Sequence, residues 1–154
     1  MSDPLVETWH IHNRINLYLL DAIAEDALPC VSASKGRTVG EQIAHLHAVR
    51  LMWLKAAAPA RLKGLETFDK KDPPDRTRLR RALLASGEAV AGLLIDGAAN
   101  GGKIKGFKPH ATAFLGYLVA HESHHRGQIL LTLKQSGRMV DKKIQYGLWE
   151  WGVR

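Results

Sequence analysis

Four long segments with apolar residues at helical spacing constrain the fold of this 154-residue chain more than any other feature. Within each segment, apolar residues recur every three or four positions, as they do on one face of an amphipathic α-helix. No stretch of useful length alternates between apolar and polar residues, which is the pattern of a half-buried strand. The sequence therefore predicts an all-α protein, most economically a four-helix bundle formed by a single domain over residues 1–154.

Proline, glycine and capping residues predict where these helices begin and end. The segment T-V-G-E can form a capping box, in which the side chains of Thr38 and Glu41 each accept a hydrogen bond from the other's backbone N–H. The glycine-rich stretch G-A-A-N-G-G after Asp96 is expected to end the third helix, because glycine holds helical order poorly. The expected helices cover residues 4–26, 38–58, 76–96 and 109–136.

The C-terminal segment D-K-K-I-Q-Y-G-L-W-E-W-G-V-R is expected to add a short helix. Its Trp149 and Trp151 are expected to cover the bundle. The loops at residues 59–74 and 97–108 are long and polar enough to shape a pocket mouth or to bind a partner.

Basic residues outnumber acidic ones by 22 to 15, which gives a formal charge of +7. This charge favours encounters with anions but does not name one. The basic residues concentrate in R-T-R-L-R-R (76–81) and K-I-K-G-F-K (103–108), where Phe107 is the one nearby aromatic residue. Because a single-strand binder needs several aromatic rings for stacking, these segments are expected to be solvated surface, and a nucleic-acid partner is disfavoured.

The number of cysteines and the N-terminal segment indicate the cellular compartment in which the protein is expected. The single cysteine, Cys30, cannot form an internal disulfide, so nothing in the sequence requires an oxidising environment. The start M-S-D-P-L-V-E-T-W-H lacks the basic and apolar pattern of a signal peptide, and no later stretch reaches about 18 uninterrupted apolar residues. We expect a cytoplasmic protein with no membrane partner.

Helical geometry groups a few of the eight histidines on shared faces. An α-helix turns by about 100° per residue, so His125 projects about 40° to one side of His121 and Gln128 about 20° to the other. His124 lies about 60° away and is expected at the margin of this face. On the second helix, His45 is expected to point into the bundle.

The stripe of His45 includes Met52 and Trp53, whereas His47 lies about 200° away and should face elsewhere. A histidine pair four residues apart can bind one metal ion, and an imidazole from a facing helix would complete three ligands with an open position for water or substrate. The alternative is that these histidines are core or interface residues, each satisfied by a hydrogen bond.

The segment H-E-S-H-H also contains H-E-x-x-H, a pattern found in zinc peptidases, in which the glutamate activates water. Here Gln128 occupies the position of the glycine that extends the motif in one peptidase class, and no histidine follows His125. A peptidase also usually needs a sheet edge to hold an extended substrate. The zinc peptidase interpretation is therefore disfavoured.

The segments T-V-G-E-Q-I-A-H-L-H-A-V-R-L-M-W-L (38–54) and H-E-S-H-H-R-G-Q-I (121–129) resemble the DinB-like superfamily of small four-helix bundles. The likeness spans nearly the whole chain in order. Carried over residue by residue, it implies His45, His121 and His125 as ligands of a divalent metal ion, with zinc or nickel expected. It also implies a homodimer, and several members resemble thiol transferases that join a low-molecular-weight thiol to an electrophile.

A metal-bound water or thiol is then the expected reactive group, in an enzyme of the thiol-transferase or hydrolase type acting on a small molecule. The residues expected to line or support the pocket are Gln128, His124, His12, Trp53 and Met52. Arg126 is expected to pair with an acid on a neighbouring helix or subunit. The alternatives are a non-catalytic metal-binding module for stress response or interaction, and a nucleic-acid-binding protein.

Overall fold

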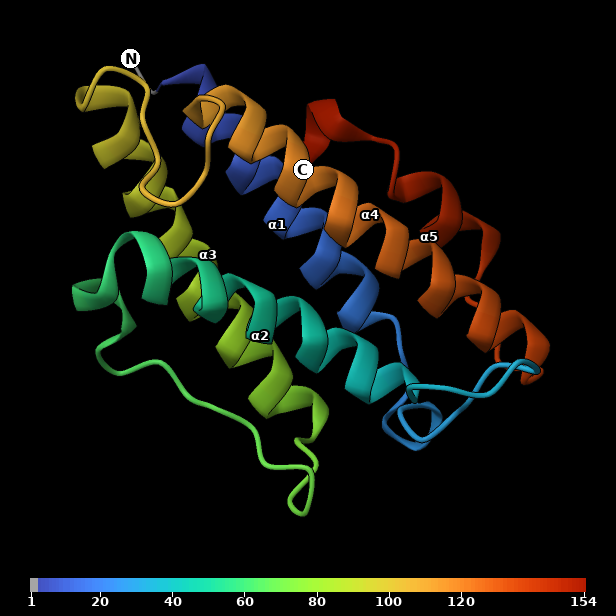
Figure 1. The fold of residues 1–154 in the computed structure, drawn as a ribbon. Coiled ribbons are helices and arrows are strands. Elements are labelled where there is room, and N and C mark those ends of the chain that lie inside the picture. Colours follow the sequence, from blue (N-terminus) through green and yellow to red (C-terminus); the bar gives the residue numbers. More distant parts are fainter. Residues whose placement is uncertain (1–2) are drawn as a thin grey trace.

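The computed structural model describes residues 3–154, and four long helices make up most of them (Figure 1). The α-helices are α1 (Pro4–Asp21), α2 (Val39–Ala57), α3 (Arg76–Ala99), α4 (Ala111–Gln135) and α5 (Lys142–Gly147). Short 3-10 turns occupy Glu25–Ala27, Pro59–Leu62 and Trp151–Val153. Residues 3–154 contain no strand, only two isolated bridges, so the predicted all-α bundle with a short C-terminal helix is confirmed.

Side chains cap the helices where the sequence predicts them. The Thr38 hydroxyl accepts from the backbone N–H of Glu41 at 3.0 Å, and the Glu41 carboxylate accepts from the N–H of Thr38 at 2.8 Å. The Asp75 carboxylate accepts from the N–H of Arg78 at 2.8 Å and begins α3. These bonds satisfy N–H groups that have no partner within the helix, and thereby fix where α2 and α3 start.

Two predicted helix ends were wrong by several residues. Helix α1 ends at Asp21 rather than at residue 26, because its last turn tightens and the Glu25 carboxylate instead accepts the N–H of Arg76 at the start of α3. Helix α3 continues past Gly97 to Ala99. A Cβ on Gly97 would lie 2.5 Å from Ile104, so the glycine serves a close packing contact inside the helix rather than ending it.

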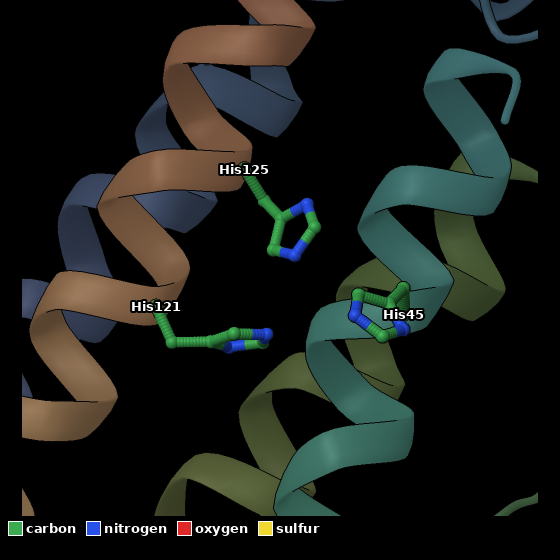
Figure 2. A group of neighbouring side chains, drawn as sticks. All are labelled: His45, His121 and His125. Carbon is green, nitrogen blue, oxygen red and sulfur yellow. The ribbon is translucent and has the colours of Figure 1, made fainter. Parts of the chain in front are cut away.

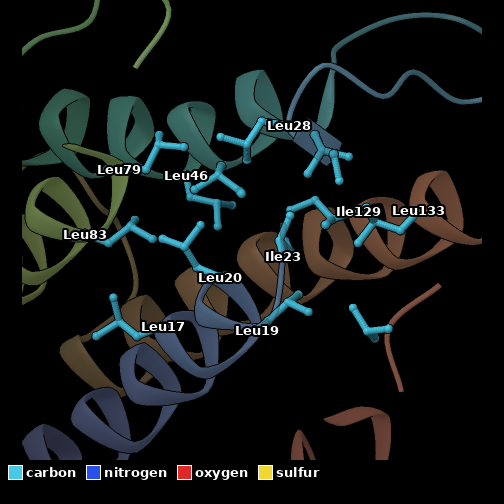
Figure 3. Close-up of a cluster of buried hydrophobic side chains, with 14 of the residues drawn as sticks. Leu17, Leu19, Leu20, Ile23, Leu28, Leu46, Leu79, Leu83, Ile129 and Leu133 are labelled. Carbon is cyan, nitrogen blue, oxygen red and sulfur yellow. The ribbon is translucent and has the colours of Figure 1, made fainter. Parts of the chain in front are cut away.

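The hydrophobic core consists of two apolar clusters at opposite ends of the bundle. One contains the leucine-rich ends of the helices shown in Figure 3, including Leu20, Leu46 and Leu83. The other gathers around Trp9 and Phe114. Between them lies a polar layer, to which α1, α2, α3 and α4 all contribute. Its buried members are His12, Asn13, Asn16, Arg50, Ser86 and Glu122.

Helix α5 and the chain end pack on α1. A Cβ on Gly147 would lie 2.4 Å from the Tyr18 hydroxyl, and the Arg154 guanidinium lies 3.8 Å from the centre of the Tyr18 ring. Trp151 is partly buried against the core, but Trp149 is 81% exposed. The expectation that both tryptophans cover the bundle is therefore wrong for Trp149, because the final turn directs its ring to solvent.

Helix α3 is long and apolar enough to span a membrane by length and composition alone. Half of its apolar window is buried inside the bundle, and core helices pass the same test, so this match is weak evidence for a membrane span. Its basic start is largely neutralised by ion pairs. Arg78 pairs with Glu66 at 2.6 Å and with Asp72 at 3.0 Å, and Arg80 pairs with Asp21 at 2.9 Å.

Candidate metal centre

Three histidines from two helices converge at the edge of the bundle (Figure 2). His45 projects from α2, and His121 and His125 project from successive turns of α4. One ring nitrogen from each residue lies within 4.8 Å of the others. The ring centres are 4.6 Å apart for His45 and His125, 4.7 Å for His121 and His125, and 5.4 Å for His45 and His121. The structure therefore places the three predicted ligands together.

The position of this cluster differs from the expectation that His45 points into the bundle. His45 and His121 are partly exposed, and only His125 is buried. In the stripe that follows His45 along α2, Met52 is 53% exposed, whereas Trp53 is partly buried. His45 therefore faces α4 across the rim of the α2 and α4 pair, where a small molecule could reach it from solvent.

A hydrogen bond from α2 orients the buried histidine. The Nδ1 atom of His125 lies 2.9 Å from Oε1 of Gln42, and both residues are buried. Because an amide oxygen only accepts, Nδ1 carries the proton and Nε2 keeps its lone pair for a metal. The sequence interpretation missed Gln42, although it lies three residues before His45 and so on a neighbouring part of the same helix face.

The local electrostatics keep the imidazoles neutral. Burial, together with the neighbouring rings of His45 and His121, lowers the pKa of His125 to about 4. Burial and the positive charge of Arg37 lower the pKa of His45, and burial also lowers that of His121. Since a metal binds the unprotonated imidazole, all three donors are available at neutral pH.

The donor set fits a divalent ion of the zinc or nickel class. Three neutral imidazoles suit such ions, and the group contains no carboxylate or thiolate from residues 3–154. In addition, Nδ1 of His121 is buried and has no hydrogen-bond partner among these residues. Buried polar atoms are rarely left unpaired, which points to a ligand or ion at this position.

The residues predicted to line or support the pocket lie in different places relative to the histidine cluster. His124 and Gln128 are exposed beside the cluster, and the His124 ring centre lies 5.0 Å from that of His125. Trp53 is partly buried two turns from His45. Met52 is on the outer surface of α2, as described above. His12 lies inside the bundle in the polar layer, where its Nε2 donates to Oε2 of Glu122 at 2.8 Å.

His47 faces away from the centre, as its position on the helix predicts. It is buried, and its Nε2 lies 2.6 Å from the carbonyl oxygen of Glu66. Burial lowers its pKa, although the hydrogen bond to that carbonyl acts in the opposite direction. His47 is therefore a core histidine that fixes the long loop after α2.

The glutamate of the H-E-x-x-H segment does not reach the centre. Glu122 is 1% exposed and accepts from Arg50 through both carboxylate oxygens, from His12 and from Asn16. With all these bonds made inside the bundle, the carboxylate cannot activate a water beside His121. The segment therefore matches the peptidase pattern in letters but not in geometry.

Within the chain, Arg126 does not hydrogen-bond to an acid on a neighbouring helix, one of the two partners expected for it. Its guanidinium donates to the side-chain oxygen of Asn16 at 2.8 Å and to the hydroxyl of Ser123 at 3.2 Å, rather than to an acid. It therefore extends the polar layer from α4 toward α1.

Comparison with known protein families identifies the family of the chain. The family model described as "DinB family" matches residues 1–150, nearly the whole chain. The chain belongs to the DinB family. A solved structure of a DinB-like protein from Bacillus cereus ATCC 10987 superposes with a TM-score of 0.59 at 21% identity, over 89% of this chain and 93% of that one. At this identity the likeness supports the DinB-like fold alone. None of the curated proteins compared with the chain matches it.

Proposed function

We propose that this DinB-family chain is a divalent-metal-dependent enzyme that activates a small thiol for transfer to an electrophile. The observation that carries the proposal is the convergence of three neutral imidazoles at a solvent-accessible edge, without a fourth ligand from residues 3–154. Three protein ligands leave a coordination position open, which is typical of catalytic rather than structural sites.

The chain's own residues would hold and orient the ion. His45, His121 and His125 supply the donor nitrogens, and Gln42 fixes the ring of His125 through its Nδ1 proton. A bound divalent ion supplies a Lewis acid that lowers the pKa of a thiol at the open position. In the transfer, the thiol proton leaves to solvent, sulfur bonds to the electrophilic carbon, and the leaving group departs with the electron pair of the broken bond.

The environment favours thiol transfer over peptidase-like hydrolysis. Hydrolysis of that type needs a carboxylate to take a proton from water, and Glu122 is committed to Arg50 and His12 instead. A thiol ionises much more readily than water and has less need of such a base. Arg37 is exposed and has no ion-pair partner among residues 3–154, while its charge reaches His45 and His121. It is suited to hold a carboxylate of the thiol.

The test is a thiol-transfer assay on protein purified without an affinity tag. Glutathione or cysteine is offered with monochlorobimane, and the rate is compared for protein as purified, after chelation, and after zinc or nickel is restored. We expect the rate to fall with metal removal and in His121→Ala, and to persist in the control His10→Ala on α1. Bound metal without turnover for any thiol would support the alternative of a non-catalytic metal-binding module. Protein that binds neither metal would refute the proposal.

A further inference from the structure

Four aromatic rings form one continuous cluster beside the three histidines. They are Trp53 of α2, Phe107 of the loop before α4, and Phe114 and Tyr117 of α4, four of the ten aromatic residues among the chain's 4 Trp, 3 Tyr and 3 Phe. The ring centres of Trp53 lie 5.8 Å from Phe107, 5.3 Å from Phe114 and 5.6 Å from Tyr117. We refer to these four residues as the aromatic ledge.

The ledge continues directly into the histidine cluster. The rings of Tyr117 and His121 are nearly parallel, at 14°, with centres 6.4 Å apart. Within the ledge, Phe114 is fully buried, whereas Tyr117 is 39% exposed. An aromatic surface that is anchored in the core and open beside a ligand position can receive part of a bound molecule.

Two features distinguish the ledge from ordinary core packing. The indole N–H of Trp53 is buried and has no acceptor among residues 3–154, an unusual cost for a ring that only packs in a core. In addition, a tight turn in the loop positions Phe107 in the ledge. In this turn the backbone N–H of Phe107 donates a hydrogen bond to the carbonyl oxygen of Ile104, and Gly106 adopts a φ of 83°. The turn thus packs the partly buried Phe107 ring against Trp53 and Phe114.

The aromatic ledge and the cationic side chain of Arg37 lie on opposite sides of the histidine cluster. Trp53 near the end of α2 contacts Tyr117 near the start of α4, whereas Gln42 near the start of α2 contacts His125 farther along α4. The two helices therefore run antiparallel, with the ledge toward one end and Arg37, just before α2, toward the other. The site thus presents an aromatic cluster on one side and a positive charge on the other.

We infer that the aromatic ledge binds a planar apolar group, such as an aromatic ring, of the electrophile whose reacting atom lies beside the histidine cluster. This inference rests on the proposed metal-dependent function and names the substrate class of the same site. Aromatic rings favour contact with other rings in offset or edge-on arrangements, and the ledge supplies both orientations. The thiol's carboxylate occupies the side near Arg37, so the two reactants meet at the cluster from opposite directions.

A pair of metal-binding probes tests the ledge without relying on activity. Acetohydroxamate and benzohydroxamate share the same metal-binding group and differ by a methyl or phenyl substituent. Calorimetry on zinc-loaded protein gives both dissociation constants for the native chain, for Tyr117→Ala and for Phe107→Leu, which keeps an apolar side chain but removes the ring. Tyr146→Ala is the matched control, because Tyr146 is 71% exposed on α5.

We expect the native chain and Tyr146→Ala to prefer benzohydroxamate by about tenfold or more, because burying a phenyl ring against aromatic partners contributes that much. Both ledge variants should lose most of this preference while binding acetohydroxamate as the native chain does. Equal binding of the two probes by zinc-loaded native protein would overturn the inference and leave the metal proposal standing.

Zinc content, measured separately, distinguishes the two ideas. If the protein retains no zinc, the proposed function fails, and the ledge is judged by NMR of the metal-free chain titrated with benzyl alcohol. Shifts of the Trp53 indole N–H, assigned with Trp53→Phe, would then still support an aromatic-binding ledge. An unchanged Trp53 signal would refute it.

Discussion

The guanidinium of Arg50 holds both carboxylate oxygens of Glu122 inside the bundle, with Nε 2.7 Å from Oε1 and Nη2 2.8 Å from Oε2. Both side chains are almost completely buried. Burial alone would raise the pKa of Glu122, but the charge and hydrogen bonds of Arg50, with the hydrogen bond from His12, hold that pKa well below its usual value. Glu122 is therefore a buried anion with a structural role, next in sequence to a candidate metal ligand.

Breaking this pair should strongly destabilise the bundle. We expect Arg50→Ala to lower the free energy of unfolding by about 3–5 kcal/mol, since it leaves the Glu122 charge buried without its partner. Urea unfolding followed by circular dichroism measures the loss. Arg61→Ala serves as the control, because its pair with Asp96 is partly exposed and should contribute less than about 1 kcal/mol.

The double variant Arg50→Met with Glu122→Leu separates charge from shape. It should recover only part of the lost stability, because it removes the unpaired buried charge but leaves the donors of His12 and Asn16 without their acceptor. It should also still bind about one equivalent of zinc, since neither residue reaches the cluster. Loss of zinc from a folded double variant would show that Glu122 takes part in the metal site after all.

Metal content should depend on each of the three histidines. We expect about one equivalent of a divalent ion in the native protein and substantial loss in His45→Ala and His125→Ala, with the helical circular dichroism spectrum unchanged. Elemental analysis after gel filtration provides the measurement. His110→Ala, which alters an exposed histidine at the start of α4, is the matched substitution and should keep its metal.

Gln42 should tune metal affinity without binding the ion. Replacing it with leucine removes the acceptor for the Nδ1 proton of His125, and loss of such a supporting bond typically weakens metal binding about 10- to 100-fold. Competition with a chromogenic chelator gives the dissociation constant for zinc. Gln42→Glu keeps an acceptor and should bind zinc at least as tightly as the native chain. If Gln42→Leu binds zinc with an unchanged dissociation constant, the hydrogen bond to Gln42 does not support His125 as a metal ligand.

Acid should destabilise the metal-free protein in part through His12. Burial lowers the pKa of His12 below the ordinary value of 6.5, although its hydrogen bond to Glu122 acts in the opposite direction. Below pH 6.5 the unfolded chain therefore binds a proton that the folded chain excludes. The contribution of His12 to stability is complete above that pH and is lost as the pH falls toward the folded pKa.

The corresponding measurement is urea unfolding between pH 7.5 and 5.5 in the presence of a chelator. In His12→Gln, the slope of stability against pH should decrease by up to about 1.4 kcal/mol per pH unit, the value for one proton. Identical slopes for the native chain and the variant would show that protonation of His12 does not contribute to the acid destabilisation. His10→Gln is the control, because His10 lies near the surface on the same helix.

Periodicity and capping predicted the four helices because these signals are local. The likeness to DinB-like proteins and the spacing along the helices selected the same three histidines that the structure brings together. The Arg50 and Glu122 pair was missed, because these residues are 72 positions apart and their meeting depends on how α2 and α4 are rotated and aligned. Glu122 lies about 100° around α4 from His121, and its burial follows because a bundle helix packs against neighbours on more than one side.

The exposure of the two C-terminal tryptophans also could not be predicted from the sequence. Trp149 and Trp151 have the same apolar character and differ in exposure only because of the short turn between them. The aromatic ledge also lay beyond the sequence analysis. Phe107 was considered as a poor platform for nucleic acid, and only the fold shows that its loop returns to Trp53 of α2.

The polar layer between the two apolar clusters gives the bundle a fixed alignment along its length. Leucine-rich helices can slide past one another by a turn at little cost, but here such a slip would carry Arg50 or Glu122 into hydrocarbon without its partner. His45 on α2 and the histidine pair on α4 are close to this same level of the bundle. The polar layer therefore sets the spacing between the two halves of the candidate metal centre without the help of an ion.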